Sequence, residues 1–596
     1  MQKYSVNQHL IETILAWVNS GEIAIPEIQR PFVWDSSKVR DLMDSLYQGY
    51  PIGYVIAWRN PNVKLKDGSL SEGKKVLIDG QQRVTALTAG ILGQYVINKN
   101  YQRVKIKIAF NPIEERFEVQ NPAILKDKVW LHDITDAFSG KISLLKLVRD
   151  YLALNPDIDE DLIENSFSRL ISIVKKPIGM IELAPELDIE TVTEIFIRIN
   201  SKGVVLSQAD FAMSKIASDT ENGGNELRKA IDYFCHLAIS PDFYKQIVDN
   251  DKDFAKTDFF QKMSWLKTEN EDLYDPSYND LLRVAFTSQF SRGRLSDLVS
   301  LLSGRNFETR SYETEIAEQS FLKLKNGVYN FITETNFKRF LMIVKSAGFI
   351  SPKLIRSQNA LNFAYIVYLK LKELGVNSVA IETYVRKWLV YSILTGRYSS
   401  SPESMFDYDI KQISQKPFSE YLKEKEDGEL SEAFWNASLP QSLDTSVASS
   451  PYFNVFLASQ VKANDRGFLS KDVLVSDLIS LRGDIHHLFP KDYLSKNGLD
   501  RSKYNQIANY VYMQSEVNIK VGNKPPKDYF ELIKTQILDN NKLVSGISSE
   551  QELLDNLKMN CVPTEIMEMS IDNYEEFLTL RRKLMAQKIK EYYNKL

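Results

Sequence analysis

The sequence contains few cysteines and no long apolar segment, and both scarcities narrow the classes of protein that it can encode. Among 596 residues there are two cysteines, Cys235 and Cys561, which stand far apart. They cannot build a zinc cluster by themselves and they argue against a disulfide framework, so we expect a reducing compartment. No stretch of about 18 apolar residues occurs, and the N-terminus lacks a signal-peptide pattern. We therefore expect no transmembrane helix and a cytoplasmic location.

An excess of basic residues is also missing. The 74 Lys and Arg residues and the 78 Asp and Glu residues give a formal net charge of -4 at pH 7. This balance weighs against a protein that binds nucleic acid by its overall charge, but local basic patches can still contact phosphate groups. A basic run occurs in the last predicted helix, at Arg581, Arg582, Lys583, Lys588 and Lys590.

Histidine is scarce as well, and two of the five histidines stand side by side in the segment DIHHLFPKDYL, residues 484–494. Adjacent side chains on a strand point to opposite faces, so His486 and His487 need different roles. One imidazole can hold a metal ion, while the other can accept a proton from water because it titrates near neutral pH. The alternative is that both histidines cap the end of a strand near Pro490 without any metal.

The residues that follow predict a compact strand–strand–helix unit. The segment VYMQ, residues 511–514, is typical of a short strand, and Asn509 lies in the loop before it. Ser515 can cap a following helix that would carry Asn518. Between residues 501 and 530 there are five Lys or Arg residues and two acidic residues, which gives this unit a positive local charge.

This pattern resembles the HNH (ββα-metal) nuclease family, in the branch with a D-x-[EH]-H-[IL]-x-P signature. The resemblance implies that His487 is the general base and that Asn509 is the loop residue that orients it. It further implies that His486 and Asn518 are ligands of Mg²⁺ or Mn²⁺, which would stabilise charge on the phosphoryl group. Asp484 is a further candidate ligand.

Three nearby residues complete the prediction for the C-terminal region. Asn523 competes with Asn518 for the helix position, because both are asparagines at the right distance from the histidines. Lys520 and Lys524 are placed to contact DNA phosphates. The final ligand position therefore carries an asparagine instead of the histidine that the family name implies.

A second site is predicted near the N-terminus, where VLIDGQQRVTAL, residues 76–87, indicates a strand, a tight turn and a helix. The first turn of a helix offers free N–H groups to an anion, Gly80 permits close approach, and Arg83 can fork onto a phosphate. Asp79 could hold a metal or a ribose hydroxyl. The alternative is structural, with Asp79 as a helix cap and Arg83 in a surface ion pair. The absence of a GxxxxGK[ST] motif excludes a standard P-loop.

Four segments occur in an order that resembles the ParB/sulfiredoxin-like domain of GmrSD-type restriction proteins, over roughly residues 5–220. They are IPEIQRPFVWD, PIGYVIAWR, LIDGQQR and EIFIRINSKGVVLS. The resemblance implies binding and hydrolysis of a nucleoside triphosphate, coupled to cleavage of foreign, modified DNA. The matching nucleotide-binding positions are Gln29, Arg30, Asp79, Gly80, Gln82 and Arg83.

We therefore expect a multidomain α+β protein that is mainly helical. A ParB/sulfiredoxin-like α/β domain would occupy residues 1–220, a helical middle region residues 221–440, and a ββα-metal nuclease domain residues 441–596. The implied function is a nucleotide-dependent restriction endonuclease that cleaves modified double-stranded phage DNA, with no membrane partner; a homodimer would let one site per chain cut both strands. Two alternatives remain: a phosphorothioate-sensing nickase, and a non-catalytic DNA-binding regulator.

Overall fold

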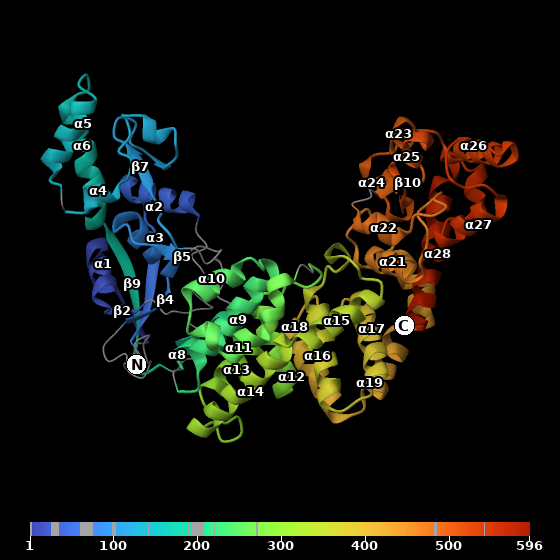
Figure 1. Cartoon of the computed structure of the whole chain (residues 1–596), viewed down its shortest axis with the longest axis horizontal. Helices are drawn as coiled ribbons and strands as arrows, with labels where there is room; N and C mark the ends of the chain where they lie inside the picture. Colours follow the sequence, from blue (N-terminus) through green and yellow to red (C-terminus); the bar gives the residue numbers. More distant parts are fainter. Residues whose placement is uncertain are drawn as a thin grey trace. The chain divides into compact units, whose positions relative to one another are not determined.

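The computed structural model describes residues 3–24, 35–59, 75–97, 103–140, 142–187, 191–192, 208–219, 221–269, 272–481, 485–541 and 543–596. These residues are mainly helical, with a small mixed sheet (Figure 1). The expected predominance of helices is thus confirmed, while the ParB/sulfiredoxin-like and ββα-metal folds stay predictions. None of the helices in these ranges is long and apolar enough to cross a bilayer.

The chain divides into two compact units, Met1–Arg228 and Lys229–Leu596. The first unit is built on a sheet with the strand order β1-β9-β3-β4-β2. Its strands are β1 (Tyr4–Leu10), β2 (Ile23–Ala24), β3 (Tyr54–Trp58), β4 (Lys75–Asp79) and β9 (Pro177–Leu183). Strand β3 runs parallel to β9 and antiparallel to β4. The start of β3 therefore lies beside the end of β4, where the predicted DGQQR turn begins.

Helices and two small hairpins complete the first unit. They are α1 (Ile11–Ser20), α2 (Ser36–Gln48), α3 (Gln81–Ile91), α4 (Thr135–Phe138), α5 (Leu144–Leu154), α6 (Glu160–Ile171), α8 (Gln208–Ser218), β5 (Val96–Ile97) with β6 (Arg103–Val104), and β7 (Ile108–Asn111) with β8 (Arg116–Val119). One face of the sheet packs against α1, α2 and α3 through alternate strand residues such as Val55, Ala57 and Leu77. This core holds β4 and α3 in place on either side of the turn.

The second unit begins with a helical region. Its helices are α9 (Gly224–Ile239, which starts in the first unit), α10 (Phe243–Asn250), α11 (Asp258–Lys262), α12 (Tyr278–Phe290), α13 (Leu295–Leu302), α14 (Thr314–Ile332), α15 (Glu334–Ser346), α16 (Gln358–Glu373), α17 (Ser378–Leu394), α18 (Pro402–Gln415) and α19 (Phe418–Glu429). Helix α16 packs against α12 and α17 (Figure 1) and is buried without interruption from Ala360 to Leu371. It is the centre of this region, because a helix that is apolar on all sides must be covered on all sides.

A buried ion pair joins the turn after α17 to α18. The guanidinium of Arg397 forks onto the carboxylate of Asp409, with N–O distances of 2.8 and 2.5 Å. The Asp409 carboxylate, which is fully buried, also accepts hydrogen bonds from the hydroxyls of Tyr398 and Tyr421. Each oxygen of this buried charge therefore has partners, which is the condition under which such pairs are tolerated.

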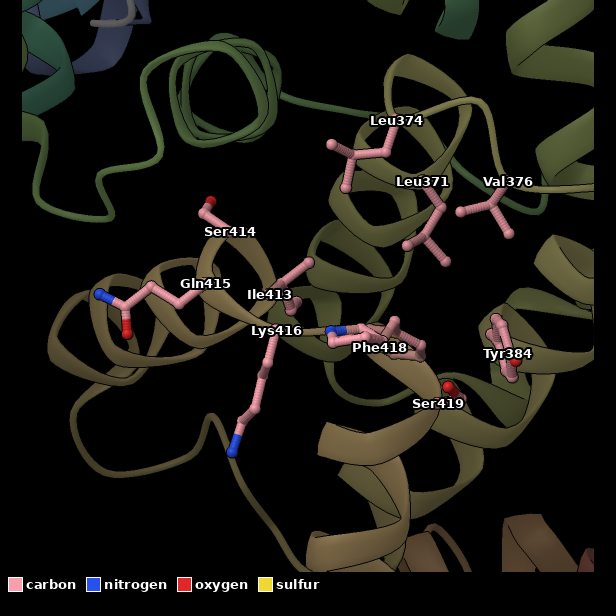
Figure 2. Close-up of a pocket in the computed structure, with 11 residues that line it drawn as sticks. Leu371, Leu374, Val376, Tyr384, Ile413, Ser414, Gln415, Lys416, Phe418 and Ser419 are labelled. Carbon is pink, nitrogen blue, oxygen red and sulfur yellow. The ribbon is translucent and has the colours of Figure 1, made fainter.

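A pocket of about 490 Å³ lies where α18 passes into α19 (Figure 2). Apolar side chains such as Leu371, Ile413 and Phe418 line it together with Lys416, whose ammonium pairs with Glu424. Its lining residues fall between Leu371 and Ser419 and include none of the residues predicted for catalysis or binding.

The C-terminal part of the second unit carries the two histidines. Its elements are α20 (Leu439–Ser442), α21 (Pro451–Lys462), α22 (Val475–Ser480), β10 (Ile485–His487), α23 (Lys491–Lys496), α24 (Arg501–Tyr504), the 3-10 turn η7 (Ile507–Asn509), β11 (Tyr510–Tyr512), α25 (Ser515–Val521), α26 (Pro526–Asp539), α27 (Glu550–Met559) and α28 (Tyr574–Asn594). The predicted domain boundaries at residues 220 and 440 stay predictions.

Candidate functional site

The two adjacent histidines lie on the first strand of a short antiparallel pair, called the hairpin below, whose strands are connected through α23, α24 and η7. Strand β10 pairs with β11 so that His486 is opposite Val511 and His487 is opposite Tyr510. Helix α25 follows β11 after two residues. Strand alternation directs the two imidazoles to different faces. The two strands and the helix follow one another in the expected order, but α23, α24 and η7 lie between the strands, and the ββα-metal fold stays a prediction.

The imidazole of His487 is bound by a neighbouring amide. Its Nε2 lies 3.0 Å from Oδ1 of Asn505, and its ring packs edge-on against Tyr510, with centroids 5.1 Å apart. An amide oxygen only accepts, so this contact favours the tautomer with the proton on Nε2 and the lone pair on Nδ1. Burial lowers the pKa of His487 below its ordinary value, and the Asn505 contact acts in the opposite direction. The neutral ring is therefore favoured, as a base requires.

Asn509 is fully buried and acts on the backbone around His487. Its Nδ2 donates to the carbonyls of Phe489 and Tyr504 at 3.1 and 3.2 Å, and its Oδ1 accepts from the Phe489 N–H at 2.8 Å. It thereby fixes the exit of β10 against the loop before β11. Its influence on the base is indirect, because the ring partner is Asn505. Sequence reasoning missed Asn505, and the only available signal was a second asparagine in the same NQIAN segment.

The predicted metal ligands are placed only in part. His486 and Asn518 are both partly buried, on β10 and α25, whereas Asp484 lies outside the described residues. Among the residues that the structure describes, no group of three His, Cys, Asp or Glu side chains could hold a metal ion. A metal site here would therefore depend on the Asn518 amide and on Asp484, and the ligand set stays a prediction.

The remaining predicted residues of this region face solvent. Lys520, Asn523 and Lys524 are exposed at the end of α25, and Nζ of Lys524 donates to the Lys520 carbonyl at 3.4 Å. Both ammonium groups are thus accessible to a large anion such as DNA. Asn523 lies beyond the last residue of α25, so Asn518 is the asparagine that the helix itself presents.

The DGQQR turn has the predicted strand–turn–helix form. Gly80 has φ +88° between β4 and α3, and a Cβ at this position would lie 3.1–3.2 Å from Val55 atoms. The glycine is thus required both by its backbone conformation and by the close approach of β3. These observations explain the glycine by the fold alone. That Gly80 also gives room to a ligand stays a prediction.

Arg83 and Asp79 pair with each other. Nη2 of Arg83 lies 3.1 Å from the Asp79 carboxylate, and its Nη1 donates to the carbonyls of Tyr54 and Ile52 at 2.6 and 3.1 Å. The guanidinium thus ties α3 to the start of β3, much as the structural alternative expects for Arg83. Asp79 does not act as the helix cap, since Gly80 occupies that position without a side-chain hydrogen bond.

The other residues of the predicted nucleotide site are less informative. Gln82 is partly buried on the first turn of α3, and Gln29 and Arg30 lie outside the described residues. Lys75, one of the basic residues around this turn, is almost fully buried; it pairs with Glu182 at 2.6 Å and lies over the Trp17 ring. The charge of Lys75 is therefore neutralised inside the fold.

Comparison with known proteins finds similarity over part of the chain. Residues 11–217 match the family model described as GmrSD restriction endonuclease, N-terminal domain. An uncharacterized protein of Methanocaldococcus jannaschii is 29% identical over 222 residues, which cover 35% of this chain and 37% of the relative. The chain thus matches little more than a third of that relative's length, and the resemblance of the C-terminal region to HNH nucleases stays a prediction. Residues 11–217 are therefore similar to the N-terminal domain of GmrSD restriction endonucleases.

Proposed function

We propose that this chain is a restriction endonuclease whose C-terminal region cleaves DNA with the help of a divalent metal ion. The match of residues 11–217 supports a role in restriction. The observation that carries the nuclease is the His487–Asn505 contact of 3.0 Å on a hairpin followed directly by a helix. This contact leaves Nδ1 of His487 to accept the proton of an attacking water molecule.

The surrounding residues have chemically distinct tasks in this proposal. His486, Asn518 and Asp484 offer an imidazole nitrogen, an amide oxygen and a carboxylate. The two oxygen donors suit Mg²⁺ or Mn²⁺, and the imidazole would be the third ligand. The bound ion would stabilise negative charge on the phosphoryl and leaving oxygens. Asn509 keeps the backbone of β10 in register with the loop. The exposed Lys520 and Lys524 attract the DNA backbone.

The N-terminal region would bind and hydrolyse a nucleoside triphosphate and so control cleavage. Its proposed binding residues are Gln29, Arg30, Asp79, Gly80, Gln82 and Arg83. Arg83 already has a carboxylate and two carbonyls as partners. For Arg83 to bind a phosphate, the nucleotide must replace at least the Asp79 contact. Nucleotide binding would then be linked to the packing of α3 against β3.

The test is a cleavage assay on three DNAs: unmodified, glucosylated-hydroxymethylcytosine phage DNA, and phosphorothioated plasmid. Each is incubated with Mg²⁺ or Mn²⁺, with and without each nucleoside triphosphate, beside the His487→Ala variant. Cleavage of a modified DNA that is lost in the variant and altered by a nucleotide supports the proposal. Nicking together with hydrolysis stimulated only by phosphorothioate DNA favours the sensing nickase. The absence of metal-dependent cleavage on every DNA favours the regulator.

A further inference from the structure

Arg581 on α28 is a buried cation whose partners are backbone carbonyls. Its side chain is 1% exposed, and it donates to the Ala508 carbonyl at 2.7 Å and to the Asn560 carbonyl at 3.3 Å. Burial lowers the pKa of Arg581 to about 10. Arg397 is buried too, but it forks onto a carboxylate. Burying a charge costs free energy unless the charge is well paired. The role of Arg581 is therefore sought in the two carbonyl groups that it binds.

The Ala508 carbonyl belongs to the peptide unit that leads into Asn509. From there the Asn509 amide holds both the N–H and the carbonyl of Phe489, and the Asn509 carbonyl accepts from the N–H of Leu488 at 2.8 Å. Leu488 directly follows His487. An unbroken series of hydrogen bonds and peptide units therefore runs from the Arg581 guanidinium to the residue that carries the predicted base.

The same face of α28 supports the hairpin at two further points. Tyr574 and Phe577, two turns and one turn before Arg581, pack their rings against Phe489 with centroids 5.2 and 5.0 Å apart. The Tyr574 hydroxyl also donates to the Lys503 carbonyl at 3.0 Å. Residues at this spacing lie along one side of a helix, so α28 forms a support for the β10 exit and η7.

The far end of α28 is anchored in the helical region of the same unit. The Tyr592 hydroxyl donates to the Ala347 carbonyl at 2.5 Å, and the Tyr593 hydroxyl donates to Glu426 at 2.8 Å. Lys590 pairs with Glu432 at 2.6 Å. The helix that carries Arg581 is thus held by groups outside the hairpin, and it can serve as a fixed reference for the loop.

We propose that Arg581 is a positioning residue of the nuclease site, which fixes η7 and, through Asn509, sets the place of His487. This proposal rests on the nuclease function proposed above. Arginine suits the task because its planar fork donates to two carbonyls at once, whereas a lysine ammonium is a single compact donor group. A misplacement of the base by about 1 Å is enough to lower the rate of the chemical step on the order of 100-fold.

The test compares Arg581→Met and Arg581→Lys with Lys583→Met, an exposed lysine of the same helix, in the full-length chain. Hydrogen–deuterium exchange is followed in residues 485–512 and, as an internal reference, in α16. For Arg581→Met we expect faster exchange confined to residues 485–512, a kcat lower by about 100-fold and a KM changed by less than about threefold. Arg581→Lys should be intermediate, and Lys583→Met should match the unmodified protein.

The outcomes separate this proposal from the one on which it rests. Unchanged exchange and kcat in Arg581→Met overturn it, as does faster exchange throughout α16, which indicates a general structural role. If Arg581→Met does not fold, Arg581→Lys decides in the same way by its exchange pattern and its kcat. If the unmodified protein cleaves no DNA, the nuclease function fails. Exchange still decides whether Arg581 holds the hairpin: a change confined to residues 485–512 supports it, and none overturns it.

Discussion

The polar side chains of the two candidate regions have different kinds of partner. At the DGQQR turn, charged groups pair with one another: Arg83 with Asp79, and Lys75 with Glu182. At the hairpin, the polar groups are supported by neutral partners, since His487 contacts the Asn505 amide and Arg581 contacts carbonyls. A ligand must break existing contacts to use the first region. In the second, the Asn505 contact engages Nε2 of His487, and Nδ1 is the proposed base.

This difference separates two kinds of support for function. The family match lies on residues 11–217, where the site charges are internally paired. The geometry on which the proposed nuclease rests lies in the second unit, outside the match. Similarity therefore points to restriction, and the hairpin points to the reaction. Variants in each region can show whether the contrast holds.

The largest expected effect comes from His487→Ala. Loss of a general base lowers rates by about 10²–10⁴-fold, so cleavage of supercoiled DNA with Mn²⁺ should become undetectable or nearly so. The matched control is His132→Ala, because His132 lies in the first unit, where its Nε2 contacts the Asp127 carbonyl at 3.3 Å. If His487→Ala cleaves DNA at the normal rate, His487 is not the base, and the hairpin no longer differs from the DGQQR turn in this respect.

The next effect distinguishes the two asparagines of the hairpin region. Asn509→Ala leaves buried backbone groups of Phe489 and Tyr504 without their partner and should destabilise this region on the order of 2–4 kcal/mol. Asn505→Ala removes one contact of a half-buried side chain and should cost less than about 1.5 kcal/mol. Urea unfolding of both variants, followed by exchange in residues 485–512, makes the comparison. Equal losses would contradict the assignment of Asn509 to the framework and Asn505 to the base.

A smaller effect is expected at the DGQQR turn. Arg83→Met should weaken nucleoside triphosphate binding by about 10–100-fold, the range for one lost charge-assisted hydrogen bond to phosphate. Arg169→Met is the matched control, because Arg169 forms an exposed ion pair with Glu115 in the same unit. Binding is measured by titration calorimetry. If Arg83→Met binds the nucleotide with normal affinity but unfolds at a lower temperature, the guanidinium only ties α3 to β3.

Local signals explain what could be predicted from the sequence in these regions. The strand, turn and helix at residues 75–91 follow from an apolar run, a glycine and a helical pattern, all within a few residues. The hairpin and α25 follow in the same way. The partners of the candidate side chains do not follow from local sequence, because tertiary packing brings them together. Asn505 is 18 residues from His487, and Arg581 is 73 residues from Ala508.

The basic run of α28 illustrates why charge in a sequence says little about exposure. Arg581 is buried beneath η7, and Lys588 pairs with the buried Asp465, whereas Lys583 is exposed. Helical spacing places successive residues on different faces, but no local pattern shows which face the rest of the chain will cover. Arg83 shows the same limit of sequence reasoning, because an arginine in an ion pair and an arginine that binds phosphate look alike in a sequence.

The smallest effect, and the sharpest test of the hairpin, is the pH dependence of cleavage. His487 acts as a base only when neutral, so the rate falls as pH drops through its pKa. Because burial lowers the pKa of His487, half of the maximal rate should be reached below the ordinary value of about 6.5. The Asn505 contact raises this pKa, so Asn505→Ala should move the acid limb to still lower pH, by a fraction of a unit. Asn505→Asp adds a negative charge and should move it upward. Rates measured across the acid range at saturating DNA and metal make the comparison. Coincident limbs in all three proteins would mean that the group at the Asn505 amide is not the base, and the hairpin would then lose the property that sets it apart from the DGQQR turn.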